Sequence, residues 1–253
     1  MRVFYISMCA VLVAALAGLA RNPAPPRQPA AAESLEDVLR DWEKAMTELK
    51  SFACEIERKS FDKPVDTRDE HRGYFMFLKA NNKEDGIRAR YKLHKATNPK
   101  IYDEYVFTGT DLYEYAPASN EVRVHKIPKG QQAGFSQEKL LSSLFGLGAE
   151  HVKAVCTMEL DPKATKDGFQ YIWIRPKPGR KVEFTQARLA LYRSNHLPAQ
   201  IWYAEANGSD MTWNFSKLQI NVPLPERSFH PEVPTGWRLV AVKAAPVVPK
   251  RMP

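Results

Sequence analysis

Short runs in which apolar and polar residues alternate recur along most of this chain, and they constrain its fold more than any other feature. The stretch YVFTGTDLYEYAPASNEVRVHKIP, residues 105–128, holds three such runs separated by two turn signals. A period of two is the pattern of a β-strand with one buried face. We therefore expect a sheet with one aromatic-rich face, and Glu121, Arg123 and His125 should point away from it. To the apolar face we assign Tyr105, Phe107, Tyr113, Tyr115, Val122 and Val124.

The same alternation predicts strands on both sides of this stretch. Gly109-Thr110 and Asn207-Gly208 are strong hairpin-turn signals. Short turns between consecutive strands favour antiparallel pairing, since parallel neighbours need long crossovers. The predicted strands are 52–61, 72–79, 87–94, 102–108, 112–115, 121–127, 152–160, 169–175, 182–185, 188–192, 199–206 and 211–220.

Two helices are predicted as well. Ser34 suits the N-cap of an amphipathic helix of about 16 residues, with Asp37 in the capping-box position. Ser136 begins a second apolar helix, SQEKLLSSLFGLG. The expected fold is α+β and mostly β: one strongly curved antiparallel sheet of about 11 strands, an incomplete barrel, with helices over its concave side.

The two ends of the chain differ from its middle. Residues 1–20 are an apolar run that we interpret as a signal peptide or an N-terminal anchor, and small residues close it. Residues 21–33 form a Pro/Ala-rich tether. The folded domain is predicted at 34–242, followed by a loose tail at 243–253. An exported protein that stays in the periplasm or cell envelope is the expectation, held at the membrane if the leader is not cleaved.

Charge and cysteine content narrow the function classes. The 253 residues carry a net charge of +8, spread along the chain without a cationic block. Together with export this argues against a nucleic-acid partner. Cys54 and Cys156 lie on apolar faces of predicted strands, and an exported protein permits a disulfide between them. Two buried free thiols are the alternative.

No motif for catalysis or metal binding is present. The six histidines show no ligand spacing such as HxxxH, and there is no GxSxG elbow, Walker loop or dinucleotide fingerprint. We therefore predict no catalytic residues, no cofactor, no metal site and no enzymatic activity. What the sequence has in excess is aromatic and apolar lining, as in GYFMFLKA and FQYIWI. This lining indicates either a fully packed core or an apolar chamber for a ligand.

The order of elements resembles the LolA-like family of bacterial lipoprotein carriers. The segments that carry this resemblance are SFACEIERKSF, RGYFMFLKA, YVFTGTDLYEYAPASNEVRVHKIP and the ending NVPLPERSFHPEVPTG. The resemblance implies an incomplete barrel lidded by helices that carries lipoprotein acyl chains across the periplasm. Where the family tends to have Arg-Pro, associated with lid closure, this chain has Lys79-Ala80, so Lys79 is the lid or gating candidate. A compact ammonium does not reproduce the bidentate bonds of a guanidinium.

The function that this resemblance implies is a non-catalytic, monomeric carrier or binder of lipoprotein acyl chains or other lipids. An envelope membrane protein is a further expected partner. The alternatives are an envelope sensor or scaffold that uses the same fold for protein interaction and, third, an uncharacterised hydrolase. The proposed apolar ligand-binding residues are Trp42, Met46, Phe75, Phe77, Tyr105, Tyr113, Trp202, Trp213 and Phe215.

Overall fold

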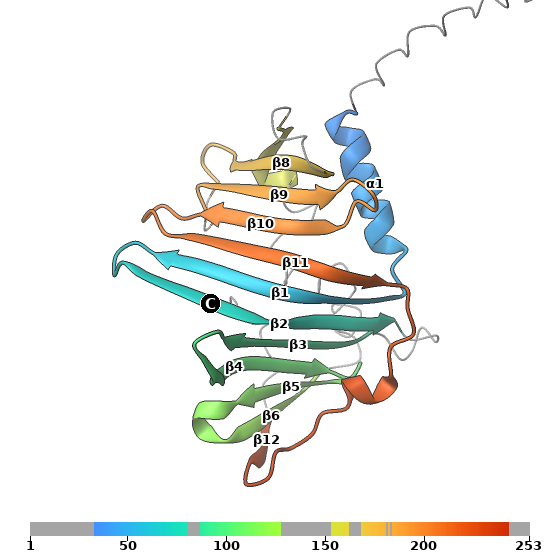
Figure 1. The fold of residues 1–253 in the computed structure, drawn as a ribbon, viewed down its shortest axis with the longest axis vertical. Helices are drawn as coiled ribbons and strands as arrows, with labels where there is room; N and C mark the ends of the chain where they lie inside the picture. Colours follow the sequence, from blue (N-terminus) through green and yellow to red (C-terminus); the bar gives the residue numbers. More distant parts are fainter. Residues whose placement is uncertain are drawn as a thin grey trace, which may run out of the picture. The chain divides into compact units, whose positions relative to one another are not determined.

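A computed structural model of the chain describes residues 33–79, 87–127, 153–161, 168–180, 182 and 184–242. In this part of the chain the helix α1 accompanies a sheet of twelve strands (Figure 1). The leader, the C-terminal tail and the predicted second helix at 136–148 lie outside the described residues. The elements are α1 (Leu35–Thr47), β1 (Ser51–Asp62), β2 (Thr67–Lys79), β3 (Ile87–Lys95), β4 (Asn98–Phe107), β5 (Asp111–Ala116), β6 (Glu121–Lys126), β7 (Cys156–Leu160), β8 (Phe169–Pro176), β9 (Gln186–Tyr192), β10 (Pro198–Ala204), β11 (Asp210–Ile220) and β12 (Arg238–Val242), with short 3-10 helices at Pro117–Ser119 and Glu226–Phe229.

Helix α1 begins where the capping signal predicts. The Ser34 side chain accepts a hydrogen bond from the Asp37 backbone N–H at 3.2 Å and donates one to the Asp37 carboxylate at 2.7 Å. The helix spans 13 residues, three fewer than expected, and buries Val38, Leu39 and Trp42. None of the described helices is long and apolar enough to cross a membrane.

The strands follow the order β12-β6-β5-β4-β3-β2-β1-β11-β10-β9-β8-β7. Strands β1 to β6 pair in chain order, β7 to β11 do the same, and β11 joins the two series by pairing with β1. All of these pairs are antiparallel, as the short turns predict. Gly109 and Gly208 both have positive φ in the predicted hairpin turns.

Three details of the predicted fold are wrong. Strand β12 was not predicted, and it pairs in parallel with β6, so the sheet is mixed. No strand is formed by residues 182, 184 and 185, and residues 153–155 of the predicted strand 152–160 are helical, so β7 begins only at Cys156. The sheet is also not strongly curled. It is open, as an incomplete barrel is, since its edge strands β12 and β7 stand at opposite ends of the strand order. Alternation specifies which side chains are buried, whereas curvature depends on bulges and register, which it does not encode.

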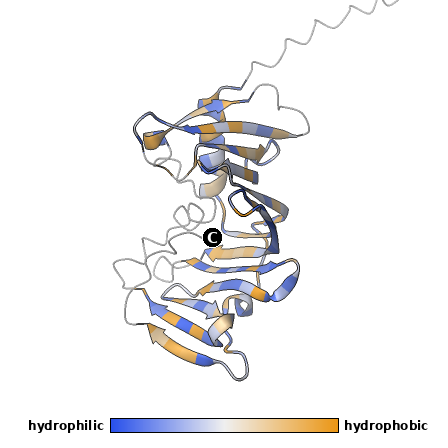
Figure 2. Ribbon diagram, turned by 90° about the vertical axis from the view of Figure 1, so that its left-hand side faces the viewer, coloured by the Kyte–Doolittle hydropathy of each residue, from blue (hydrophilic) through white to orange (hydrophobic). Residues whose placement is uncertain are grey.

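Each face of the sheet carries its own apolar cluster. We call the face shared by Phe52, Cys54 and Ile56 of β1 the inner face, since these residues form one apolar cluster with Val38 and Trp42 of α1. The opposite, outer face carries a smaller cluster of Val106, Tyr115 and Val122, packed with Trp237 among others. Hydrophobic and hydrophilic bands alternate along the strands accordingly (Figure 2).

The segment between β11 and β12 packs on the outer face. The Tyr115 hydroxyl donates to the Glu232 carbonyl at 2.8 Å, and Arg90 donates to the Ser228 carbonyl at 3.2 Å. Glu104 beneath it is only 2% exposed and binds Arg90 Nε at 2.9 Å and Lys92 Nζ at 2.8 Å. These contacts hold the chain in place just before β12, so β12 can add to the edge of β6.

Register divides the predicted aromatic face in two. Phe107 pairs with Leu112 and Tyr105 with Glu114, so Tyr105 and Phe107 share a face with Glu114. Directly opposed residues point to the same side of a sheet. Tyr113, Tyr115, Val122 and Val124 therefore lie on the outer face, opposite Tyr105 and Phe107, and their predicted common face is wrong.

Candidate functional site

Aromatic rings of β1 and β2 form the centre of the inner face. Phe52 pairs with Phe77, and Cys54 pairs with Phe75. The ring centroids of Phe52 lie 6.3 Å from Phe75 and 6.0 Å from Phe77, and those of Phe75 and Phe77 are also 6.0 Å apart. Such spacings are typical of interacting aromatic pairs. Phe77 is fully buried.

Most of the predicted ligand-binding residues join this centre. Trp213 and Phe215 of β11 point to the same face, because they pair with Arg58 and Ile56 of β1. Trp42 reaches the cluster from α1. The structure thus brings together Trp42, Phe75, Phe77, Trp213 and Phe215, with Met46 and Tyr105 packed at the margin.

Tyr113 and Trp202 do not belong to this group. Trp213 of the inner face pairs with Ile201, so the neighbouring Trp202 points to the outer face. There its ring meets that of Trp173 edge to face, with centroids 6.1 Å apart. Tyr113 is on the outer face for the register reason given above. A common cavity for all nine residues is therefore wrong, since successive side chains of a strand point to opposite sides.

The proposed gating residue Lys79 lies at the end of β2. It is exposed and is the last residue of that strand, where its backbone N–H donates to the Lys50 carbonyl at 2.8 Å. Residues 80–86 are outside the described part of the chain, so a gating contact stays a prediction.

Both described cysteines are free and buried, as the alternative to the disulfide expects. Cys54 lies between Ala53 and Glu55 on β1 with its side chain on the inner face, and burial raises the pKa of its thiol to about 12. Burial also raises the pKa of the Cys156 thiol. A neutral thiol is a poor nucleophile, so neither side chain is suited to covalent chemistry.

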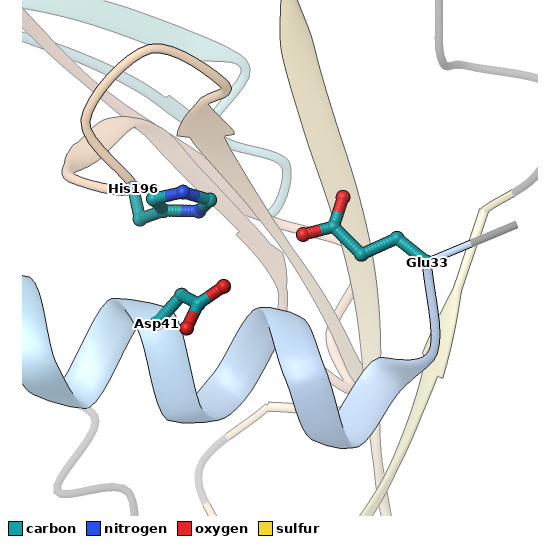
Figure 3. Close-up of side chains that lie close together, drawn as sticks. All are labelled: Glu33, Asp41 and His196. Carbon is teal, nitrogen blue, oxygen red and sulfur yellow. The ribbon is translucent and has the colours of Figure 1, made fainter. Parts of the chain in front are cut away.

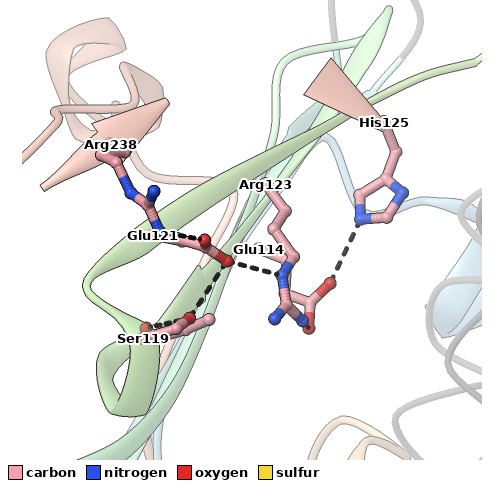
Figure 4. Close-up of polar contacts among 7 residues, drawn as sticks. Glu114, Ser119, Glu121, Arg123, His125 and Arg238 are labelled. Atoms are coloured by element: carbon pink, nitrogen blue, oxygen red, sulfur yellow. Dashed lines mark hydrogen bonds and ion pairs between the residues drawn. The ribbon is translucent and has the colours of Figure 1, made fainter. Parts of the chain in front are cut away.

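Beyond Tyr105 the inner face becomes polar (Figure 4). His125 Nε2 lies 3.1 Å from a Glu114 carboxylate oxygen, and Arg123 lies 3.5 Å from another oxygen of Glu114. Arg123 also approaches Glu121, which binds Arg238 of β12 at 2.8 Å. The charges compensate one another across β5, β6 and β12. The apolar surface is therefore bounded on this side by a chain of ion pairs.

A second group of polar side chains lies close together near the start of α1 (Figure 3). Glu33, Asp41 and His196 each offer one ligand atom, and these atoms all lie within 4.8 Å of one another. Glu33 also accepts a hydrogen bond from the side-chain amide of Gln170 in β8. Sequence reasoning missed this group, because its members have no common spacing and meet only when α1 packs near the β9–β10 connection.

Comparison with curated sequences finds a carrier protein. The chain is 31% identical over 141 residues to an outer-membrane lipoprotein carrier protein of Bordetella avium. The match covers 55% of this chain and 61% of that protein, so it spans less than two thirds of the relative's length. No family model matches. The resemblance to the LolA-like family predicted from the sequence is confirmed by this similarity.

The solved structures that resemble this chain are less similar to it in sequence than the carrier protein is. A putative outer membrane lipoprotein-sorting protein domain from Vibrio parahaemolyticus is 12% identical with a TM-score of 0.37, covering 78% of this chain and 95% of that one. The MucA/MucB complex structure of Pseudomonas aeruginosa is 13% identical with a TM-score of 0.44, covering 78% of this chain and 60% of that one. These scores are too low to carry an argument about function.

Proposed function

We propose that this chain is a non-catalytic envelope protein that binds lipoprotein acyl chains or other lipids on the apolar inner face, between the sheet and α1. The observation that carries the proposal is the continuous cluster of Trp42, Phe75, Phe77, Trp213 and Phe215, which joins α1 to the centre of the sheet. The similarity to a lipoprotein carrier supports the same class of ligand. The apolar leader supports a location in the periplasm or at the membrane.

Hydrocarbon is well suited to such a surface. Burying an acyl chain contributes roughly 0.8 kcal/mol per methylene, so a chain of ordinary length binds without any charged anchor. The ion pairs around Glu114 and Arg123 border the apolar region. Their charged side chains could bind the polar headgroup of a lipid whose acyl chain lies on the apolar surface.

Binding requires α1 to separate from the sheet. Trp42 of α1 is buried in the structure, so a ligand reaches its ring only when the helix moves. Part of the attachment of α1 is exposed and polar: the Glu43 carboxylate of α1 binds Lys153 Nζ, just before β7, at 2.9 Å. Exposed ion pairs of this kind contribute about 0–1 kcal/mol, so this contact adds little to what opposes opening.

A cross-link between α1 and the sheet tests this proposal. In the full chain, Glu43→Cys and Lys153→Cys would be joined by a short bismaleimide, and uptake of a fluorescent fatty acid would be followed by stopped-flow fluorescence. Cys54 and Cys156 are buried and should stay unmodified. We expect the cross-linked protein to take up the probe at least tenfold more slowly than the same variant without the linker.

The matched control is Glu55→Cys with Lys217→Cys, joined by the same reagent. These residues form an exposed ion pair at 2.8 Å between β1 and β11, so their linker does not involve α1. Equal slowing in both cross-linked variants would contradict entry beneath α1. A folded wild-type chain that neither takes up the probe nor carries lipid in native mass spectrometry would exclude lipid binding altogether.

A further inference from the structure

We propose that Glu33, Asp41 and His196 form a binding site for a divalent metal ion of the Zn²⁺ type, supported by Gln170. The proposal rests on this cluster alone and does not depend on whether the inner face binds lipid. Imidazole nitrogen and carboxylate oxygen are both ordinary ligands of Zn²⁺. Ligand atoms that all lie within 4.8 Å of one another need only a small adjustment to surround one ion.

The fold holds two of the three ligands on fixed backbone. Asp41 lies inside α1, whose first turn is capped by Ser34. His196 occupies the connection between β9 and β10 with φ of 55°, and its backbone N–H donates to the Tyr192 carbonyl at 2.8 Å. Its ring points toward Asp41 and Glu33 across the space between this connection and α1 (Figure 3).

The charges at the cluster favour a cation. Glu33 and Asp41 place two carboxylates close together, and like charges at short distance repel. Arg40 lies 3.5 Å from Asp41, but its closer contact is with Asp37 at 2.7 Å. A divalent ion between Glu33 and Asp41 would neutralise both carboxylates at once.

Gln170 supplies an observation independent of the three ligands. Its side chain is only 3% exposed, and its amide N–H donates to the Glu33 carboxylate. Its Oε1 is buried and has no hydrogen-bond partner among the described residues. A buried unsatisfied oxygen is costly. The amide N–H of Gln170 orients Glu33, as an outer-shell partner of a metal ligand does.

The donor set also indicates which ion fits. Ca²⁺ prefers six to eight oxygen ligands, and Mg²⁺ keeps several waters in octahedral geometry. An imidazole with two carboxylates is better matched to Zn²⁺ and related transition metals. A bound ion would join the start of α1 to β8 and to the β9–β10 connection, and so hold the helix against the sheet.

Calorimetric titration of the tag-free full chain, freed of metal by a chelator, tests the site. We expect one Zn²⁺ per chain and much weaker binding of Ca²⁺. His196→Asn and Asp41→Asn should each weaken Zn²⁺ binding by about tenfold or more, by analogy with losses at ligand-supporting positions. Asn tolerates positive φ, so the first variant keeps the backbone of the connection. The thermal midpoint of the wild type should rise with Zn²⁺ and that of the variants should not.

Two matched controls separate this site from chance binding. His230→Asn removes an exposed histidine elsewhere, and Glu36→Gln removes an exposed carboxylate of α1 outside the cluster. Both should bind Zn²⁺ like the wild type. Three results would each overturn the proposal: no stoichiometric Zn²⁺ binding by the wild type, wild-type Zn²⁺ affinity in His196→Asn or Asp41→Asn, or a preference for Ca²⁺.

Discussion

Burial on the inner face changes the chemistry of individual side chains. It raises the pKa of the Cys54 thiol and of the Tyr105 hydroxyl, each to about 12, and it raises the pKa of Tyr91 as well. The common cause is desolvation, which disfavours the anion of each group. These three groups therefore remain neutral at physiological pH. The apolar character of the face extends from β1 to β4.

The Cys54 thiol should make stability depend on pH in the alkaline range. Its ordinary pKa is 9.0, so the unfolded chain loses this proton above about pH 9 while the folded chain keeps it. Because the folded state then holds more protons, the free energy of unfolding falls as pH rises from about 9 to 12. The loss of unfolding free energy caused by this thiol approaches about 1.4 kcal/mol for each pH unit in this range.

Urea unfolding of the wild type and of Cys54→Ala at pH 8, 9 and 10 measures this contribution. The free energy of unfolding of the variant should fall less steeply above pH 9 than that of the wild type. The difference between the two proteins at pH 8 measures the packing energy lost by the substitution, which does not depend on pH. Parallel pH profiles for the two proteins would show that the thiol ionises in the folded state as easily as in the unfolded one.

Among the elements, β2 shows how closely two strands can approach. Gly73 pairs with Ile56 on one side and with Leu93 on the other. A Cβ atom built at Gly73 would lie 1.8 Å from the Lys92 carbonyl oxygen. No side chain fits at this distance unless the backbone moves, so only glycine is compatible with the observed β2–β3 pairing.

Gly73→Ala should therefore destabilise the sheet. Overpacking of a tight site costs typically about 1–3 kcal/mol, and here the neighbouring atom is backbone and yields poorly. Urea unfolding of the variant should show a midpoint shift in that range. Thr67→Ala, at the exposed start of the same strand, is the control and should change stability by less than about 0.5 kcal/mol. A Gly73→Ala variant as stable as the control would mean that β2 and β3 separate without cost.

At the scale of the whole molecule, one sheet carries two separate apolar clusters. Trp213 belongs to the inner cluster, which includes residues of α1, and Tyr115 belongs to the outer cluster, which packs with Trp237 of the segment before β12. The backbone of the sheet lies between them. Side chains on opposite faces share no packing partner, so the two clusters should contribute to stability independently.

A double-mutant cycle tests this independence. The free energies of unfolding lost in Trp213→Phe and Tyr115→Phe should add to within about 0.5 kcal/mol in the double variant. Phe75→Leu with Phe77→Leu is the comparison pair, and its rings on one face should couple by about 0.5–3 kcal/mol. Strong coupling between Trp213 and Tyr115 would show that the sheet transmits packing changes from one face to the other.

The sequence alone determined the elements of this protein. Period-two alternation and Gly-containing turns predicted most of the strands and their antiparallel pairing, and Ser34 with Asp37 marked the start of α1. These signals are local, because a strand's buried face and a helix cap depend on residues a few positions apart. The same signals placed Trp42, Phe75, Phe77, Trp213 and Phe215 on apolar faces as candidate ligand-binding residues, and the structure assigns them to one buried cluster.

Only the tertiary structure decided which residues meet. The register at the β4–β5 hairpin separated Tyr105 from Tyr113, and an unpredicted parallel pairing placed β12 beside β6. Packing of α1 near the β9–β10 connection brought His196 to Glu33 and Asp41, more than 150 residues away in the chain. The physical reason is the same in each case: strand register and helix docking depend on contacts between distant segments, and no local pattern contains them.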